Sequence, residues 1–315
     1  MERRTNKIKL PSLLLAVLML LSIGSAAASA KELTTTNPTL VVAAEAFSIG
    51  NGYAAVPEEV TCKEGENGAQ ILDRVLKENG LTHNYGGTLT DQYYLKSIGF
   101  ENTDKIPQCV LGHIGDYIDG GSGSTLGEQD YTALSGWLFT VNGKPLQVSL
   151  NDYYPRQGDI LRVQYSLWYG AEVGLANAME MDKWMGISDF YPVAEKDELT
   201  RQLAVVNRNG GAALADGKVK AAYDEAMAAV QTLDISQKDA DRALYQLVLA
   251  QNPECKLGDI DNDGELKVSD VLAIQKYIAL VNMFTVIERA QADFNGDGAV
   301  SVADVLAIQR VIAKA

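Results

Sequence analysis

The sequence predicts a multidomain protein with an α+β domain, a small three-helix bundle and an all-α terminal domain. Residues 39–170 are rich in aromatic, β-branched and glycine residues, whereas residues 195–251 are rich in alanine, leucine and charged residues with helical spacing. Residues 256–315 contain an internal repeat. The chain of 315 residues is long enough for two or three domains of ordinary size.

The first thirty residues have the three-part pattern of a secretory signal peptide. Arg3, Arg4, Lys7 and Lys9 precede the apolar run LPSLLLAVLMLLSIGS, and a run of small residues ends at Ala30. We therefore expect cleavage after Ala30 and an extracellular mature protein with no transmembrane anchor, because the apolar run is too short to span a bilayer comfortably. An uncleaved N-terminal anchor is the alternative.

The composition excludes several classes of function. Acidic residues outnumber Lys and Arg by 41 to 27, and the formal net charge of −14 disfavours binding to nucleic acids. With only two histidines, the sequence offers few ligands for a zinc site and few candidates for histidine-dependent catalysis. Three cysteines are too few for a disulfide scaffold. In an oxidising exterior Cys62 and Cys109 could pair, with Cys255 left over.

The first part of the mature chain has the pattern of an α+β domain. Strand-like segments, with β-branched and aromatic content, lie at residues 39–47, 91–100, 136–143 and 159–170. Residues 68–80 have apolar side chains at helical spacing, and Gly80 stands where a helix C-cap glycine belongs. Asn142 and Gly143 predict a hairpin turn. Residues 115–130 are predicted to be a flexible, glycine-rich loop.

The second part predicts three short amphipathic helices at residues 198–207, 218–233 and 236–251. Asn209 and the two glycines after it separate the first two helices, and Asp234 and Ser236 are candidate N-caps of the third. The arrangement resembles the three-helix spacer repeats of bacterial surface proteins. A spacer is therefore expected, and a ligand-binding helical module is the alternative.

The third part is a tandem repeat. Residues 258–279 and 292–313 are identical at 12 of 22 aligned positions. Each copy begins with a twelve-residue loop that carries oxygen-bearing side chains at positions one, three, five and twelve and glycine at position six. Ca²⁺ takes six to eight oxygen ligands, and this spacing wraps a backbone around such an ion. The sequence therefore predicts two calcium sites, one in each repeat.

The predicted ligands fall at equivalent positions in the two loops. Glu265 and Ala299, at position seven, are expected to contribute main-chain carbonyls, which explains why their side chains can differ. The predicted metal ligands are Asp259, Asp261, Asp263, Glu265 and Asp270 in the first loop, and Asp293, Asn295, Asp297, Ala299 and Asp304 in the second.

Each loop is followed by a predicted helix. The segment before the first loop, NPECKLG, contains a proline and a glycine and does not predict an entering helix. The expected unit is thus a loop plus an exiting helix, or half of an EF-hand. Apolar stripes that can pack together are formed by Val271, Ile274 and Ile278 in one exiting helix, and by Val305, Ile308 and Ile312 in the other.

The tandem of loop–helix units over residues 256–315 resembles a type I dockerin. The resemblance implies a fold that requires two Ca²⁺ ions and a partner that is a cohesin domain of a scaffoldin in a cellulosome-like or amylosome-like complex. The alternative is that the two Ca²⁺ loops only stabilise a terminal domain. The resemblance assigns cohesin contacts to Val268, Ser269, Gln275 and Lys276 in the first repeat, and to Val302, Ala303, Gln309 and Arg310 in the second. Because the two sets are similar, we expect either repeat to engage the cohesin, related by a half-turn.

Residues 39–170 resemble the transcobalamin C-terminal-like domain, a β-grasp-related module of unassigned function. The match is carried by Gly136-Trp137, Val141-Asn142-Gly143, Tyr153, Gly158-Asp159, Tyr165 and the SIG at 97–99. In vitamin carriers the related domain caps cobalamin, but those proteins also need a helical-barrel domain that is not recognised in this sequence.

Together these observations divide the chain into a signal peptide (1–30), a β-grasp-like domain (31–174), a three-helix spacer with linkers (175–255) and the dockerin (256–315). We expect a secreted, non-catalytic component of a glycan-degrading complex, held at the cell surface or in the complex through a scaffold. Aromatic rings suit sugar stacking, and those near loop ends are Tyr153, Tyr154, Trp168 and Tyr169.

Two alternatives stay open for the N-terminal domain. It could be a polysaccharide-active hydrolase or a protease of unrecognised type, although no pair of carboxylates is marked by the sequence. It could also capture cobalamin or a peptide.

Overall fold

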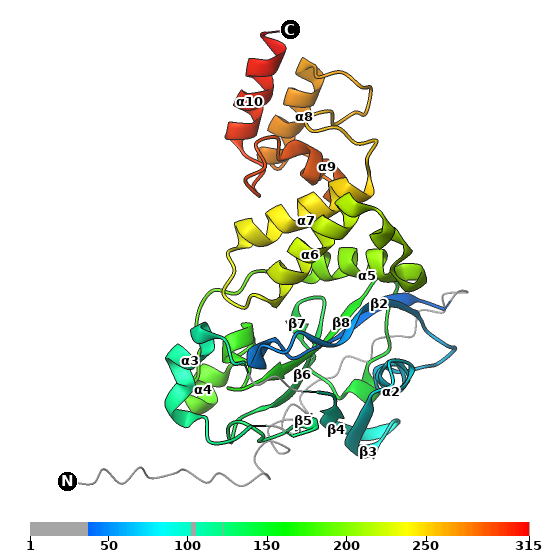
Figure 1. Ribbon diagram of the computed structural model, residues 1–315, viewed down its shortest axis with the longest axis vertical. Helices are drawn as coiled ribbons and strands as arrows, with labels where there is room; N and C mark the ends of the chain where they lie inside the picture. The colour runs from blue at the N-terminus through cyan, green and yellow to red at the C-terminus, as the bar shows by residue number, and fades with distance from the viewer. Residues whose placement is uncertain (1–36, 102–104, 122, 315) are drawn as a thin grey trace, which may run out of the picture. The chain divides into compact units, whose positions relative to one another are not determined.

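The computed structural model describes residues 37–101, 105–121 and 123–314, so the expected signal peptide lies outside it. The chain forms two compact units, one ending at Phe190 and one beginning at Tyr191 (Figure 1). The first unit contains the sheets, and the second contains the three predicted spacer helices together with the terminal repeat. Within the described ranges no helix is both long and apolar enough to cross a membrane.

A five-stranded sheet with the order β2-β1-β8-β6-β7 forms the centre of the first unit. The central strands β1 and β8 run parallel, and the other neighbours are antiparallel. Every residue of β8 is buried, as expected of a strand at the middle of a sheet. The bounds are β1 Thr39–Glu45, β2 Tyr53–Thr61, β6 Gly136–Val141, β7 Lys144–Pro145 and β8 Ile160–Ser166.

The turn between β6 and β7 confirms the hairpin predicted from the sequence. Asn142 and Gly143 have φ angles of 51° and 71°, the left-handed values that a type I′ turn requires at both central residues. The Asn142 side chain also accepts a hydrogen bond from the backbone N–H of Ile160 at 3.0 Å. This hydrogen bond ties the end of β6 to the start of β8, where Val141 pairs with Leu161.

A second, three-stranded sheet has the order β3-β4-β5, with β3 Thr82–Thr88, β4 Asp91–Gly99 and β5 Thr125–Gly127. The segment at 115–130 was expected to be a flexible loop, and that expectation is wrong at β5. Leu126 is fully buried, and its carbonyl accepts a hydrogen bond from Trp137 Nε1 at 2.9 Å. Three residues are too few to give a periodic signal, so only this tertiary packing reveals the strand.

Helix α2 (Gly68–Glu78) confirms the predicted helix of the first unit. Asn67 and Gln70 form a reciprocal capping box at its start, and Gly80 has a φ of 72° just beyond its end. Its apolar face is fully buried. The shorter helical segments of this unit are η1 Phe47–Ile49, α3 Gln108–Ile114, η2 Gly115–Tyr117, η3 Leu150–Asp152, η4 Ala171–Val173 and α4 Met181–Met185.

The second unit begins with the three predicted helices, α5 (Asp197–Gly211), α6 (Gly217–Gln231) and α7 (Gln237–Gln251). Helical geometry is broken near the end of α5, where Asn209 and Gly210 have positive φ angles, and the short helix η5 (Ala212–Ala215) follows. Of the two candidate N-caps, Asp234 and Ser236, it is Ser236 that caps α7, by accepting a hydrogen bond from the backbone N–H of Asp239.

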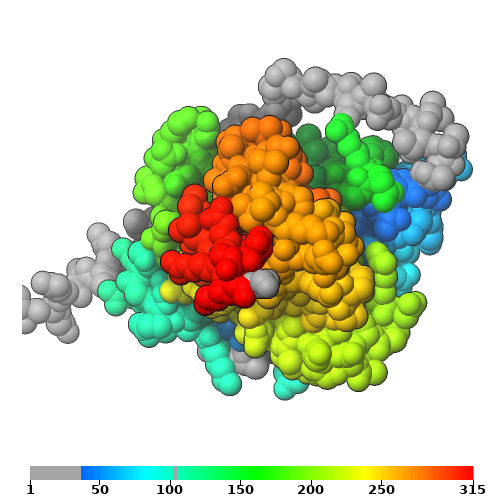
Figure 2. Space-filling view, turned by 90° about the horizontal axis from the view of Figure 1, so that it is seen from above, coloured from blue at the N-terminus to red at the C-terminus, as the bar shows by residue number. Residues whose placement is uncertain are grey.

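The terminal repeat forms helices α8 (Val268–Ile278), α9 (Val286–Ala292) and α10 (Val302–Ile312). The exiting helices α8 and α10 pack side by side, as Figures 1 and 2 show. Ile278 and Ile312 pack at the edge of the shared core. The residues buried at its centre are Ile260, Val271, Ile274, Phe284, Ala292, Val305 and Ile308. The predicted apolar stripes therefore meet.

Helix α9 corrects the expectation that each repeat is only a loop plus an exiting helix. It precedes the second loop, so that half has a helix on both sides. Thr285 and Glu288 form a capping box at its start, and the preceding Phe284 is buried and stacks on Tyr277 with ring centroids 4.6 Å apart. The motif at 285–288 is the sequence signal that could have revealed this helix.

The disulfide between Cys62 and Cys109, which the sequence left open, is not formed. Within the described part of the chain, Cys62 is a buried thiol and is not bonded to Cys109. Burial raises the pKa of the Cys62 thiol to about 11. A thiol with so high a pKa carries little thiolate at neutral pH, so Cys62 acts as a small core residue.

A buried ion pair joins the two parallel strands of the central sheet. Arg162 on β8 donates from Nε to Glu45 Oε1 at 2.7 Å and from Nη2 to Glu45 Oε2 at 2.9 Å. The side chains are 10% and 1% exposed, respectively. The two parallel hydrogen bonds give both oxygens of the buried Glu45 carboxylate a partner.

We expect Arg162→Met to lower the free energy of unfolding of the first unit by about 3–5 kcal/mol, because it leaves the Glu45 carboxylate buried without its cation. All three tryptophans, Trp137, Trp168 and Trp184, lie in this unit, so tryptophan fluorescence during urea denaturation measures its stability. The double variant Glu45→Leu/Arg162→Met is the control and should recover most of the loss. Equal stability of the wild type and the single variant would contradict the role of the pair.

Candidate calcium loops and a surface groove

The first loop folds around the carboxylate of Asp259. This buried carboxylate accepts hydrogen bonds from the backbone N–H of Asp263 at 3.1 Å and of Gly264 at 2.9 Å. Asp263 in turn accepts one from the N–H of Glu265 at 3.0 Å. The loop backbone is thus drawn around side chains that face a common centre.

Asp270, at the last position of the first loop, closes the loop on itself. It is 1% exposed, and its two oxygens accept hydrogen bonds from the backbone N–H groups of Ile260 and Lys267, both at 2.9 Å. Asp270 also lies in the first turn of α8, where the helix dipole favours a negative charge. One side chain therefore fixes both ends of the loop.

The second loop repeats this geometry. Asp293 accepts hydrogen bonds from the N–H groups of Asp297 at 3.0 Å and Gly298 at 2.8 Å. Asp304 accepts them from Asn295 at 3.0 Å and Ser301 at 2.8 Å. The bonds to Asp259 and Asp293, and those from position nine to Asp270 and Asp304, differ by 0.1 Å between the loops. The bond from position three to the last carboxylate is longer in the first loop, at 3.4 Å against 3.0 Å.

Glycine is required at position six of both loops. Gly264 and Gly298 have φ angles of 91° and 85°, values that a side chain disfavours. Their N–H groups are the donors that reach Asp259 and Asp293. Glycine recurs at position six of both loops because the backbone there adopts a positive φ angle.

The donor set fits a calcium ion. Oxygens of Asp259, Asp261 and Asp263 all lie within 4.8 Å of one another, the span that ligands about 2.4 Å from one ion can occupy. Each carboxylate oxygen that accepts one hydrogen bond keeps a second lone pair for a metal. In the second loop, burial raises the pKa of the Asp293 carboxyl group, and the N–H groups of Gly298 and Asp297 oppose this. A bound divalent cation would stabilise such a carboxylate in its charged form.

The remaining predicted ligands lie at the rim of the loops. Glu265 is exposed, and its carboxylate is 3.0 Å from Lys267 Nζ, so its side chain points to a lysine. Ala299 has no side-chain oxygen, and its N–H donates to Asp297. Main-chain carbonyls at position seven stay a prediction.

The residues predicted to contact a cohesin are exposed in both repeats. Val268 and Val302, at the start of α8 and α10, are 71% and 59% exposed. The other residues of the two sets, which are Ser269, Gln275, Lys276, Ala303, Gln309 and Arg310, are exposed as well. Leu272 and Leu306 were not singled out from the sequence, yet they are 49% and 48% exposed one helical turn beyond the two valines. Their spacing of four from the valines is the signal that could have found them.

The four aromatic residues considered for sugar stacking lie in different surroundings. Tyr153 donates a hydrogen bond to Asp159 at 2.6 Å and packs beside Gly68. Trp168 and Tyr169 pack against a cluster of buried residues centred on Ala171. Of the four, Tyr154 has the most exposed ring, at 60%. The structure therefore does not bring these four rings together on one face.

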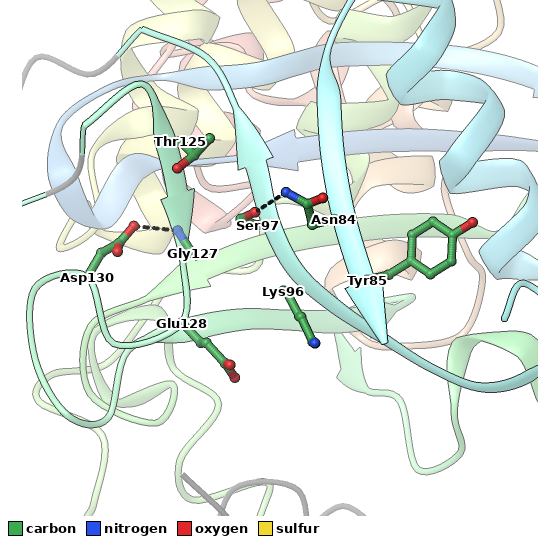
Figure 3. A pocket seen from close by; sticks show the side chains of 8 residues that line it. All are labelled: Asn84, Tyr85, Lys96, Ser97, Thr125, Gly127, Glu128 and Asp130. Atoms are coloured by element: carbon green, nitrogen blue, oxygen red, sulfur yellow. Dashed lines mark hydrogen bonds between the residues drawn. The ribbon is translucent and has the colours of Figure 1, made fainter. Parts of the chain in front are cut away.

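A polar groove of about 480 Å³ lies on the three-stranded sheet instead (Figure 3). Tyr85 on β3 also lines the groove and is 36% exposed; its ring is stacked on His83, packs against Tyr93 and points away from the other labelled side chains in Figure 3. Lys96 on β4 contributes a cation. The full lining consists of Asn84, Tyr85, Lys96, Ser97, Thr125, Gly127, Glu128 and Asp130.

The two carboxylates of the groove have partners within the fold. Glu128 accepts a hydrogen bond from the Tyr94 hydroxyl at 2.6 Å, and Asp130 accepts one from the N–H of Gly127 at 2.6 Å. Burial raises the pKa of the Asp130 carboxyl group, and the Gly127 hydrogen bond opposes this. The sequence placed both residues in a flexible loop and gave no signal for the groove.

Comparison with known proteins bears on the terminal repeat. Residues 257–313 match the family model of the dockerin type I domain. Such domains bind Ca²⁺, and proteins that carry them are extracellular components of cellulosomes. No curated protein matches the chain.

Removal of calcium is expected to unfold the terminal repeat and leave the first unit folded. For a dissociation constant of about 10 μM, millimolar Ca²⁺ contributes about 2.7 kcal/mol per site, a large part of the stability of so small a domain. Excess EGTA should therefore lower the helical circular dichroism signal while tryptophan fluorescence, which reports the first unit, stays constant. An unchanged helical signal would contradict the assignment.

Proposed function

We propose that the type I dockerin domain at residues 257–313 attaches this protein, in a calcium-dependent manner, to a cohesin domain of a scaffoldin, while the first unit binds polysaccharide. The observation that carries the first part is the match to the dockerin family together with two loops that share the same pattern of hydrogen bonds to buried carboxylates. The protein would then be a non-catalytic, secreted component that serves polysaccharide catabolism by bringing its complex to a glycan.

Two equivalent faces support binding of the cohesin in either of two orientations. Gln275 and Lys276 on α8 correspond to Gln309 and Arg310 on α10, and all four are exposed. Leu272 and Leu306 add an apolar side chain next to each polar pair. A surface with an apolar centre and a polar rim is typical of protein interfaces.

We expect Gln275→Ala/Lys276→Ala to change cohesin affinity by less than about threefold, because α10 can replace α8 after a half-turn. The matched variant Gln309→Ala/Arg310→Ala should behave alike. The quadruple variant should lose affinity by a factor of about 100 or more. Isothermal titration with a panel of cohesins measures this, and complete loss in either double variant would exclude the second orientation.

The groove on the three-stranded sheet supports the proposed role of the first unit. The partly exposed ring of Tyr85 at the edge of the groove can offer an apolar face to the CH face of a sugar, and the amide, hydroxyl, ammonium and carboxylate groups of the groove suit its hydroxyls. The sheet order β2-β1-β8-β6-β7, with its parallel central pair, also supports a β-grasp-like fold for this unit. Six of the eight lining residues lie on the strands β3, β4 and β5, and Glu128 and Asp130 follow β5 directly.

We expect Tyr85→Ala to weaken polysaccharide binding by about tenfold, because it removes the stacking face. Affinity gel electrophoresis of the intact protein across soluble glycans is the measurement. Tyr154→Ala, which removes a more exposed ring outside the groove, is the matched control and should bind as the wild type does. Equal loss in both variants would contradict the groove as the binding site.

The alternatives give different results in the same assays. Release of reducing sugar, abolished by Glu128→Gln or Asp130→Asn, would favour a hydrolase, since both carboxylates line the groove and burial raises the pKa of Asp130. A thermal shift with cobalamin or peptides and no glycan binding would favour capture of a small molecule.

A further inference from the structure

An ion pair links helix α7 to the second calcium loop. Lys238 Nζ lies 2.7 Å from Asp297 Oδ2, and the two side chains are 51% and 40% exposed. Asp297 is the predicted ligand at loop position five. A residue outside the dockerin repeat therefore contacts a predicted metal ligand.

The first loop has the same ion pair from a different source. Lys267 Nζ lies 2.6 Å from Asp263 Oδ2, the equivalent carboxylate, and the side chains are 46% and 38% exposed. Lys267 occupies position nine of its own loop, whereas position nine of the second loop is Ser301. The second loop lacks this lysine in its sequence, and the structure supplies one from α7.

The main chain of α7 also lies directly on the second loop. A Cβ atom added to Gly298 would be 1.9 Å from the carbonyl oxygen of Lys238, whereas one added to Gly264 would meet only Lys256 Nζ, at 3.8 Å. Gly298 is buried and Gly264 is exposed. The two loops are alike in geometry but differ in what covers them.

Further along its length α7 packs against α9, and Asp241 and Tyr245 of α7 lie near enough to Arg289 and Asp293 for those charges to affect their pKa values. Tyr245 is 6% exposed. The ion pair at Lys238 is therefore one end of a packed interface and not an isolated surface contact.

We propose that Lys238 of helix α7 is the counter-cation of the second calcium loop, in the place that Lys267 holds in the first loop. The three helices α5 to α7 are then not a plain spacer, because α7 is part of the surroundings of a calcium site. The inference rests on the calcium binding proposed above. Since an ammonium group bonded to a ligand carboxylate repels a divalent cation, each lysine lowers the calcium affinity of its own loop.

Site-resolved calcium titration tests this proposal. The N–H groups of Gly264 and Gly298 donate to Asp259 and Asp293, so their amide resonances in protein labelled with ¹⁵N-glycine report the two loops separately. In the full chain without its signal peptide, Lys238→Ala should tighten calcium binding about threefold to tenfold at Gly298 and leave Gly264 unchanged. Lys267→Ala should tighten calcium binding at Gly264 and leave Gly298 unchanged. Lys238→Glu should tighten binding at Gly298 more than Lys238→Ala does.

The control is Lys220→Ala, which removes the same charge from α6, where Lys220 pairs with Asp224. It should alter neither loop. An effect of Lys238→Ala on both loops, on neither, or toward weaker binding at Gly298 would overturn the role of Lys238. If neither glycine in the unmodified protein responds to calcium, calcium binding itself is excluded and the role of Lys238 falls with it.

Discussion

The terminal domain depends on buried carboxylates that gather the backbone N–H groups of their own loops. Asp259, Asp270, Asp293 and Asp304 are each no more than 3% exposed, and such burial of charge is costly unless hydrogen bonds and an opposite charge compensate. The hydrogen bonds are present within the loops, and a bound calcium ion would supply the charge. Folding and metal binding would then be one equilibrium in this domain, and calcium would be a condition for any surface that α8 and α10 present.

In each unit, the buried charged groups and the proposed binding surface lie on different parts of the fold. In the first unit, the Glu45–Arg162 pair joins the parallel strands at the centre of one sheet, while the groove lies on the strands of the other. In the second unit, the calcium loops set the start of α8 and α10, and with it the position of their exposed side chains. Stability and recognition are thus assigned to different residues.

Patterns that are local in sequence were predicted well. The helices at α2, α5, α6 and α7, the turn at Asn142 and the apolar stripes of α8 and α10 follow from spacing and capping alone. Strand β3 was missed because it is mostly exposed, contains two glycines and shows no alternation, and β5 and α9 are too short to be periodic. The four aromatic residues were chosen because they lie near predicted loop ends. That position does not reveal tertiary partners such as Asp159, which accepts a hydrogen bond from Tyr153.

The sequence by itself determined the two twelve-residue loops and predicted calcium ligands in them, because side chains within twelve residues are brought together by the chain that connects them and the repeat displays their spacing twice. Only the tertiary structure decided that the polar groove lies on the three-stranded sheet and that Lys238 lies against Asp297. Those contacts join elements that are distant in sequence, and their distances are set by the packing of whole helices and strands, which no local spacing records.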